Sequence, residues 1–210
     1  MKQAFQWVKT GKVEVKDVPV PITLPGRVLV KNSISVISSG SERQNMEFAR
    51  KGLIGKALDR PDLARRVIAL AQTEGLLDAY RQASARLDTL IPLGYTSAGL
   101  VTEAGEGVDR FKPGDRVACA GVGYASHAEI ISVPCVLCIP VPDGVDYEDA
   151  AFATLGAIAL HALRLAEPQL GDRVVIIGLG LLGLLAVQIA KAWGCQVLGT
   201  DIAANKADLA

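Results

Sequence analysis

The sequence predicts an α/β plus β protein, in which a β-rich domain precedes the beginning of an α/β domain. Two observations support this class. Short alternating apolar runs separated by Gly and Pro turns fill most of the chain up to Pro142. From Arg173 onward the pattern becomes a strand, a glycine-rich turn, a helix and a second strand. Half of the 210 residues are hydrophobic, which is enough to bury a sizeable core.

The first domain is predicted to span residues 1–145. Residues 2–37 alternate like antiparallel strands, and similar runs return between residues 94 and 142, as in a compact barrel or sandwich. Between them, residues of about 42–90 have helical spacing and balanced charges, which predicts a solvated helical insert.

The second domain is predicted to begin at residue 146 and to be incomplete. Residues 147–166 are Ala-rich and helical in pattern, residues 173–177 form an apolar β-branched strand, and a helix follows to about Trp193. A second strand covers residues 196–200, and the last residues lie in a further helix. A sheet with only two such strands leaves apolar faces uncovered, so we expect this piece alone to be inactive and prone to aggregation.

The glycine-rich turn carries the main functional signal. Gly178 permits a tight turn, Gly180 lets a pyrophosphate approach the backbone, and Gly183 lets the helix pack on the strand. Phosphate charge then meets free N–H groups at the positive end of the helix that starts near Leu181. These residues are the candidate dinucleotide-binding set. A turn that uses glycines only for packing is the alternative.

Asp201 ends the second strand, about twenty residues after the glycines, where a carboxylate accepts hydrogen bonds from an adenosine ribose. The same negative charge repels a 2′-phosphate. The sequence therefore favours NAD(H) over NADP(H) as cofactor.

Charge and composition exclude several other classes. Lys and Arg balance Asp and Glu at 22 each, without a basic run, which argues against nucleic acid or an anionic membrane as partner. The N-terminus lacks a secretory pattern, and three glycines divide the apolar stretch 174–190. We expect a cytoplasmic protein with reduced cysteines.

Several motifs resemble the medium-chain dehydrogenase/reductase superfamily, which includes the zinc-type alcohol dehydrogenases: FKPGDRV, PVPDGVDYEDAAF and LGDRVVIIGLGLLG. The resemblance implies a GroES-like first domain, a Rossmann second domain, a small alcohol or carbonyl substrate and a homo-oligomeric full-length form. Other passages, such as RLDTLIPLGYTSAGLV, are similar to bi-domain oxidoreductases with a downstream domain of the Gfo/Idh/MocA type. That relationship implies sugar-derived substrates and a truncated chain.

The resemblance also shows where zinc ligands are missing. Ser39 stands at the first ligand position, Gly94-Tyr95-Thr96 replaces Gly-His-Glu, and Thr154 replaces a third ligand. Hydroxyl oxygens do not substitute for thiolate and imidazole around zinc, so we predict no catalytic zinc. An unusual zinc set drawn from Cys119, His127 or acidic residues is the alternative.

Without zinc, a hydroxyl must supply the proton that a carbonyl oxygen takes up on reduction. Tyr95 is the candidate general acid and Ser41 matches the proton-relay hydroxyl of the family, while a merely packed tyrosine is the alternative. His127, His161, the Cys135–Cys138 CxxC and Cys195 are interpreted as structural. The sequence thus predicts an NAD(H)-linked, zinc-independent dehydrogenase or reductase acting on CH–OH groups. A non-catalytic nucleotide-binding or scaffolding module and a zinc-dependent dehydrogenase are the alternatives.

Overall fold

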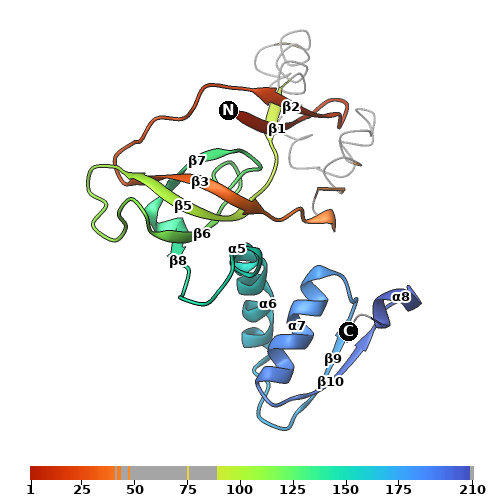
Figure 1. The fold of residues 1–210 in the computed structure, drawn as a ribbon. Coiled ribbons are helices and arrows are strands. Elements are labelled where there is room, and N and C mark those ends of the chain that lie inside the picture. Colours follow the sequence, from red (N-terminus) through yellow and green to blue (C-terminus); the bar gives the residue numbers. More distant parts are fainter. Residues whose placement is uncertain (41, 44–46, 48–74, 76–88, 209–210) are drawn as a thin grey trace.

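The computed structural model describes residues 1–40, 42, 43, 47, 75 and 89–208. These residues form a β-rich part followed by an α/β part, which confirms the predicted fold class (Figure 1). The helical insert predicted for residues 42–90 lies almost entirely outside the described residues.

The N-terminal strand lies in the middle of a small antiparallel sheet. Strand β1 (Lys2–Trp7) pairs on one side with β2 (Val13–Asp17) and on the other with β4 (Leu90–Pro92). This pairing joins the beginning of the chain to the segment that follows the insert.

A five-stranded antiparallel sheet forms the centre of the β-rich part. Its order is β7 (Ile130–Pro134), β3 (Arg27–Ser35), β5 (Thr96–Ala104), β6 (Arg116–Ala120) and β8 (Cys138–Pro140). Alternate valines from these strands are completely buried and form one apolar cluster: Val28, Val30, Val101, Val117 and Val133. The predicted strand run through Cys135 is wrong in one place, because Cys135–Leu137 forms a 3₁₀ turn, η1, between β7 and β8.

The α/β part begins with two helices. The sequence predicts one helix over residues 147–166, but the structure has α5 (Tyr147–Ala150) and α6 (Ala153–Ala166). The carbonyl of Ala151 at the break accepts a 2.6 Å hydrogen bond from Thr96 Oγ1. This bond ties the helix break to β5, so a tertiary contact interrupts a locally favourable helix.

The predicted strand, turn, helix and strand then follow in order. They are β9 (Arg173–Ile177), α7 (Leu181–Ala192) and β10 (Gln196–Thr200), and α8 (Ala204–Ala207) comes last. Strands β9 and β10 run parallel, and α6 and α7 pack side by side. Leu163 of α6 and Ala190 of α7 share a buried cluster with Cys195.

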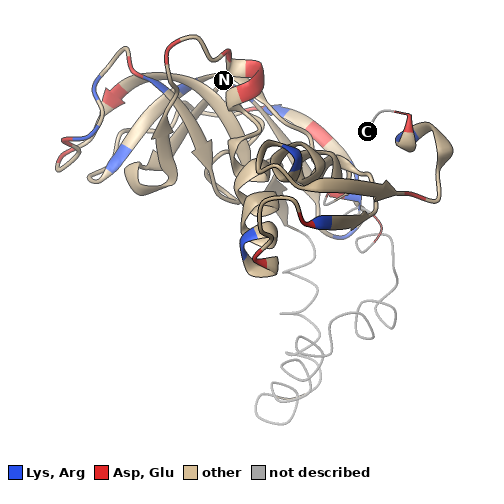
Figure 2. Ribbon diagram, turned by 90° about the horizontal axis from the view of Figure 1, so that it is seen from below, with Lys and Arg blue, Asp and Glu red and all other residues tan. Residues whose placement is uncertain are grey.

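One face of the β9–β10 pair is apolar and exposed. Val174 and Val197 face the α6–α7 cluster, whereas Val175, Ile177 and Leu198 are 58%, 87% and 62% exposed. Figure 2 shows acidic and basic residues interspersed along the described chain, with no continuous stripe of one sign. None of the helices within the described ranges has the length and apolar character needed to span a membrane.

Candidate functional site

The three glycines of the β9–α7 turn have different surroundings. Gly178 has φ +96°, a left-handed conformation that glycine adopts without strain. A Cβ atom at Gly178 or Gly180 would meet no other atom within 4 Å. The backbone of the turn therefore borders open space, which is what a phosphate group needs to approach it.

Gly183 has the opposite surroundings, because a Cβ atom there would lie 1.9 Å from the carbonyl oxygen of Gly178. Only a residue without a side chain lets the first turn of α7 pack this closely on the end of β9. The sequence assigned this packing role to the third glycine, and the geometry agrees with that assignment.

No side chain caps the N-terminus of α7 or neutralises its partial positive charge. Gly180 is the N-cap residue and has no side chain to cap the helix, and the first turn contains no acidic residue. The helix runs for 12 residues from Leu181. Its free N–H groups and partial positive charge suit an anion such as a pyrophosphate.

Asp201 lies beside the glycine turn, with its side chain only 5% exposed, and already has protein partners. Its Oδ2 accepts a 2.8 Å hydrogen bond from Leu179 N, and its Oδ1 accepts a 2.9 Å bond from Ala203 N. Lys206 Nζ lies 3.4 Å from Oδ2. The backbone N–H groups of Ala203 and Leu179, with smaller help from Lys206, hold the pKa of this carboxyl below its ordinary value.

The bond from Leu179 N to Asp201 was missed in the sequence analysis, as was Lys206. Sequence spacing places Asp201 at the end of the second strand, but it does not reveal which donors face the carboxylate. Lys206 lies on the short helix α8, whereas Asp201 precedes that helix, so their contact depends on the intervening turn and the five-residue spacing gave no signal for it.

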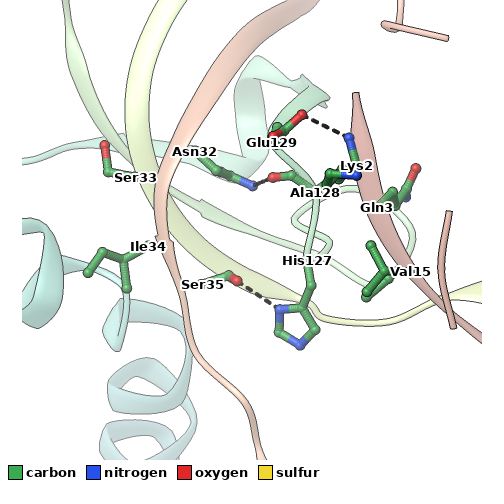
Figure 3. Close-up of a pocket in the computed structure, with 11 residues that line it drawn as sticks. Lys2, Gln3, Val15, Asn32, Ser33, Ile34, Ser35, His127, Ala128 and Glu129 are labelled. Atoms are coloured by element: carbon green, nitrogen blue, oxygen red, sulfur yellow. Dashed lines mark hydrogen bonds between the residues drawn. The ribbon is translucent and has the colours of Figure 1, made fainter. Parts of the chain in front are cut away.

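A second polar cluster lies in the β-rich part, around His127 (Figure 3). His127 Nδ1 is 2.8 Å from Ser35 Oγ, and its Nε2 is 3.1 Å from Glu42 Oε1. A carboxylate only accepts hydrogen bonds, so Nε2 carries the hydrogen and, in the neutral ring, Nδ1 accepts the Ser35 hydroxyl. The His127 and Glu42 side chains are only 13% and 11% exposed.

This cluster also contacts the segment of Tyr95. A Cβ atom on Gly94, which has φ +92°, would lie 2.7 Å from His127 N and 2.8 Å from its Nδ1. The next residue, Tyr95, is half-buried, and its carbonyl accepts a hydrogen bond from Gly121 N. A pocket of about 310 Å³ adjoins the cluster, with Asn32, Ser35, His127 and Glu129 among its lining residues.

The remaining predicted residues are dispersed or lie outside the described residues. Ser41 is outside them, although its chain neighbour Glu42 is described. Ser39 is exposed, and Thr154 is half-buried in the first turn of α6.

His161 is exposed on α6. The Cys195 thiol is buried and donates to the carbonyl of Gln169 at 3.6 Å. Among described residues, no three His, Cys, Asp or Glu side chains meet as a metal-binding group.

Comparison with known proteins shows which class of protein the chain resembles. The family model described as "Alcohol dehydrogenase GroES-like domain" matches residues 66–143. The family model and the similar sequences support a relationship to the medium-chain dehydrogenase/reductase superfamily, and the solved structures show that the fold is shared.

Individual relatives share modest identity with this chain. It is 31% identical over 136 residues to (R,R)-butanediol dehydrogenase of Bacillus subtilis, a match that covers 53% of this chain and 38% of that protein. Galactitol-1-phosphate dehydrogenase from Escherichia coli superposes with a TM-score of 0.74 at 24% identity, over 100% of this chain and 58% of the other.

Quinone oxidoreductase from Escherichia coli, solved in complex with NADPH, has a TM-score of 0.71 at 20% identity, over 99% of this chain and 55% of the other. Both solved structures are less than 25% identical to this chain, so their similarity shows a shared fold alone. The chain spans about half the length of the relatives it matches, or less.

Proposed function

We propose that the chain belongs to an NAD(P)-linked dehydrogenase or reductase that acts on a small alcohol or carbonyl compound. The glycine turn is the observation that carries the proposal. Gly178 and Gly180 leave the backbone open at the uncapped N-terminus of a 12-residue helix, and Asp201 lies beside them. This arrangement fits a dinucleotide whose pyrophosphate lies on the turn and whose ribose lies near Asp201.

We further propose NAD(H) as the preferred form. The negative charge of Asp201 opposes a 2′-phosphate, but Lys206 at 3.4 Å offsets part of that charge. A carboxylate has about four acceptor positions, and three donors already face Asp201, so one position is left for a ribose hydroxyl.

The proposed reaction does not depend on zinc. The positions that resemble the ligand set hold the hydroxyl side chains of Ser39, Tyr95 and Thr154, and this donor set does not fit the metal. The alternative ligands are also committed elsewhere, because Cys119 faces Cys138 while His127 faces Ser35 and Glu42.

Tyr95 is the proposed proton donor and Ser41 the proposed relay hydroxyl. When bound, the reduced nicotinamide supplies the hydride that reaches the carbonyl carbon. The negative charge that develops on the carbonyl oxygen then takes a proton from the Tyr95 hydroxyl. Ser41 passes a replacement proton to Tyr95.

A Tyr95→Phe variant of the full-length protein tests this role. We expect turnover to fall by about 10²–10⁴-fold, because the proton donor is lost, while nucleotide affinity stays unchanged. The measurement is steady-state kinetics over a panel of alcohols and aldehydes, alongside calorimetric titration of NADH. Tyr124→Phe is the matched control, and unchanged kcat in Tyr95→Phe would exclude Tyr95 as the acid.

The substrate, location and assembly are proposals as well. Relatives named for a butanediol and for a galactitol phosphate support small polyol or sugar-derived substrates. We propose a cytoplasmic homo-oligomer with domains at residues 1–145 and 146–210. The bi-domain resemblance, with a Gfo/Idh/MocA-type partner domain, rests on the sequence passages alone, and the comparisons lend it no support.

A non-catalytic nucleotide-binding or scaffolding module is the second candidate. It is favoured by the hydrogen bonds of Asp201, because the carboxylate already has two backbone partners without a ligand. Nucleotide binding without turnover on any substrate of the panel would select this candidate.

A further inference from the structure

Two of the four cysteines meet across neighbouring strands. Cys119 on β6 and Cys138 on β8 are direct partners in the antiparallel register, and their Sγ atoms are 3.8 Å apart. Both side chains are buried, at 1% and 0% exposed, in the core of the β-rich part. The sequence draws attention to the CxxC of Cys135 and Cys138, but the structure gives Cys138 a partner 19 residues away.

We propose that Cys119 and Cys138 form a thiol modification site, which a peroxide oxidises to a reversible intramolecular disulfide. Directly opposed residues of antiparallel strands have Cα atoms about 4.5–5.5 Å apart, within the range of about 4.4–6.8 Å that disulfides span. Rotation about the two Cα–Cβ bonds brings the sulfur atoms into bonding contact, so the backbone of the sheet keeps its register.

The position of β8 gives an oxidant access to the buried pair. Strand β8 is three residues long and forms the edge of the five-stranded sheet, where β6 is its one partner among the residues that the structure describes. Pro134 ends β7 and Pro140 ends β8, and Val136 in the turn between these strands is 79% exposed. A short edge strand opens locally at low cost, which exposes Cys138 without unfolding the sheet.

The surroundings of the pair indicate which sulfur reacts first. The two Sγ atoms share a hydrogen bond in which either can donate, and this contact lowers the pKa of Cys138 despite its burial, with help from the charge of Arg110. The same interaction, with desolvation by burial, raises the pKa of Cys119. Cys138 lies on the edge strand β8, whereas Cys119 lies on β6 inside the sheet, so we assign Cys138 as the attacking sulfur and Cys119 as the resolving thiol.

The chemistry balances with one peroxide molecule. The Cys138 thiolate attacks the O–O bond and forms a sulfenic acid, while the departing oxygen takes up protons and leaves as water. The Cys119 sulfur then displaces the hydroxyl of the sulfenic acid as a second water, and the S–S bond forms. The two thiols lose two electrons and two protons in total, and hydrogen peroxide is reduced to two molecules of water.

The new bond would close a loop of the protein that carries His127. Residues 119–138 include the turn at Gly121 and the strand β7, so the disulfide would fasten the sheet edge around this loop. We expect the oxidised protein to melt at a higher temperature than the reduced protein, because the cross-link restricts the unfolded chain.

Peptide mapping of the wild-type protein tests the proposal without any variant. The folded protein is treated with hydrogen peroxide, its remaining thiols are alkylated under denaturing conditions, and it is digested with trypsin and an endoproteinase that cuts after Glu. Cuts after Arg116 and Glu129 separate Cys119 from the peptide of residues 130–148. We expect one cross-linked pair, lighter than the two peptides by two hydrogen atoms, that dithiothreitol separates.

Fragmentation between Cys135 and Cys138 locates the bond on the second peptide. A cross-link at Cys138, absent in Cys119→Ala and retained in Cys135→Ala and Cys195→Ala, supports the proposal. Four alkylatable thiols after treatment, a bond between Cys135 and Cys138, or sulfinic and sulfonic acids without a cross-link would each overturn it.

Discussion

His127 illustrates how much of the β-rich part depends on single polar side chains. Its ring joins Ser35 on β3 to Glu42, and it packs against the backbone at Gly94. Ser35 and Glu42, which are close in the sequence, and the more distant Gly94 therefore all meet at one imidazole. The hydrogen bonds support the structural interpretation of His127, since a buried polar group must be paired to be tolerated.

Replacing this ring should destabilise the fold. A His127→Phe substitution retains an aromatic ring but leaves Glu42 and Ser35 without partners, which we expect to cost about 1–3 kcal/mol of unfolding free energy. Urea denaturation followed by circular dichroism measures the change. His161→Phe, at an exposed position on α6, is the control and should leave the free energy nearly unchanged. Equal stabilities of the two variants would show that the network contributes nothing.

Asp201 should make stability depend on acid pH. Its carboxyl has a pKa below the ordinary value of 3.8 in the folded protein, so the folded state binds fewer protons than the unfolded state. Its contribution is fully present above 3.8 and is lost as the pH falls through the lower folded pKa.

An Asp201→Asn variant isolates this contribution, because the amide presents N–H groups where Leu179 N and Ala203 N require acceptors. We expect its Tm to lie below that of the wild type at neutral pH, with the difference shrinking as the pH falls below 3.8. Thermal melts over a pH series provide the measurement. A difference that is constant across the whole series would contradict the assignment.

At the scale of elements, the glycines of the β9–α7 turn have two different roles, one in packing and one in the proposed binding of a ligand. Gly183 is needed for packing because Gly178 O lies where its side chain would be, whereas Gly180 borders open space. The first requirement belongs to the fold and the second fits a ligand. Substitutions to alanine can therefore separate the structural role of the motif from its proposed binding role.

The two alanine variants should behave oppositely. Gly183→Ala forces a methyl group against backbone, so we expect a loss of about 1–3 kcal/mol in unfolding free energy. Gly180→Ala should keep the stability but weaken NADH binding, since the methyl group occupies the space the pyrophosphate would use. Chemical denaturation and calorimetric titration measure the two effects. Normal NADH affinity in a stable Gly180→Ala protein would count against the glycine turn as the pyrophosphate-binding site.

Local signals explain why the β9–α7–β10 unit could be predicted from sequence almost to the residue. Its strands, glycines and helix follow each other within 28 residues, so the pattern contains the whole unit. The break between α5 and α6 could not be predicted, because it coincides with a hydrogen bond from Thr96, 55 residues earlier. The partners of His127 and Cys138 were inaccessible for the same reason, since each pairing depends on the packed sheet.

At the scale of the whole molecule, the β-rich part and the α/β part contribute different residues to the proposed function. The β-rich part carries Tyr95 and the His127 network, and the α/β part carries the glycine turn and Asp201. Helices α5 and α6 connect them, through contacts with β5 and β6. A dehydrogenase needs both contributions, because the cofactor and the proton donor must meet at one substrate.

Calorimetric titration of the purified full-length protein with NADH and NADPH, together with elemental analysis for zinc, tests the central claim most directly. We predict saturable binding of one NADH per chain, weaker binding of NADPH and no stoichiometric zinc. Absence of binding for both nucleotides, or one zinc ion per chain, would contradict the proposed NAD-linked, zinc-independent oxidoreductase.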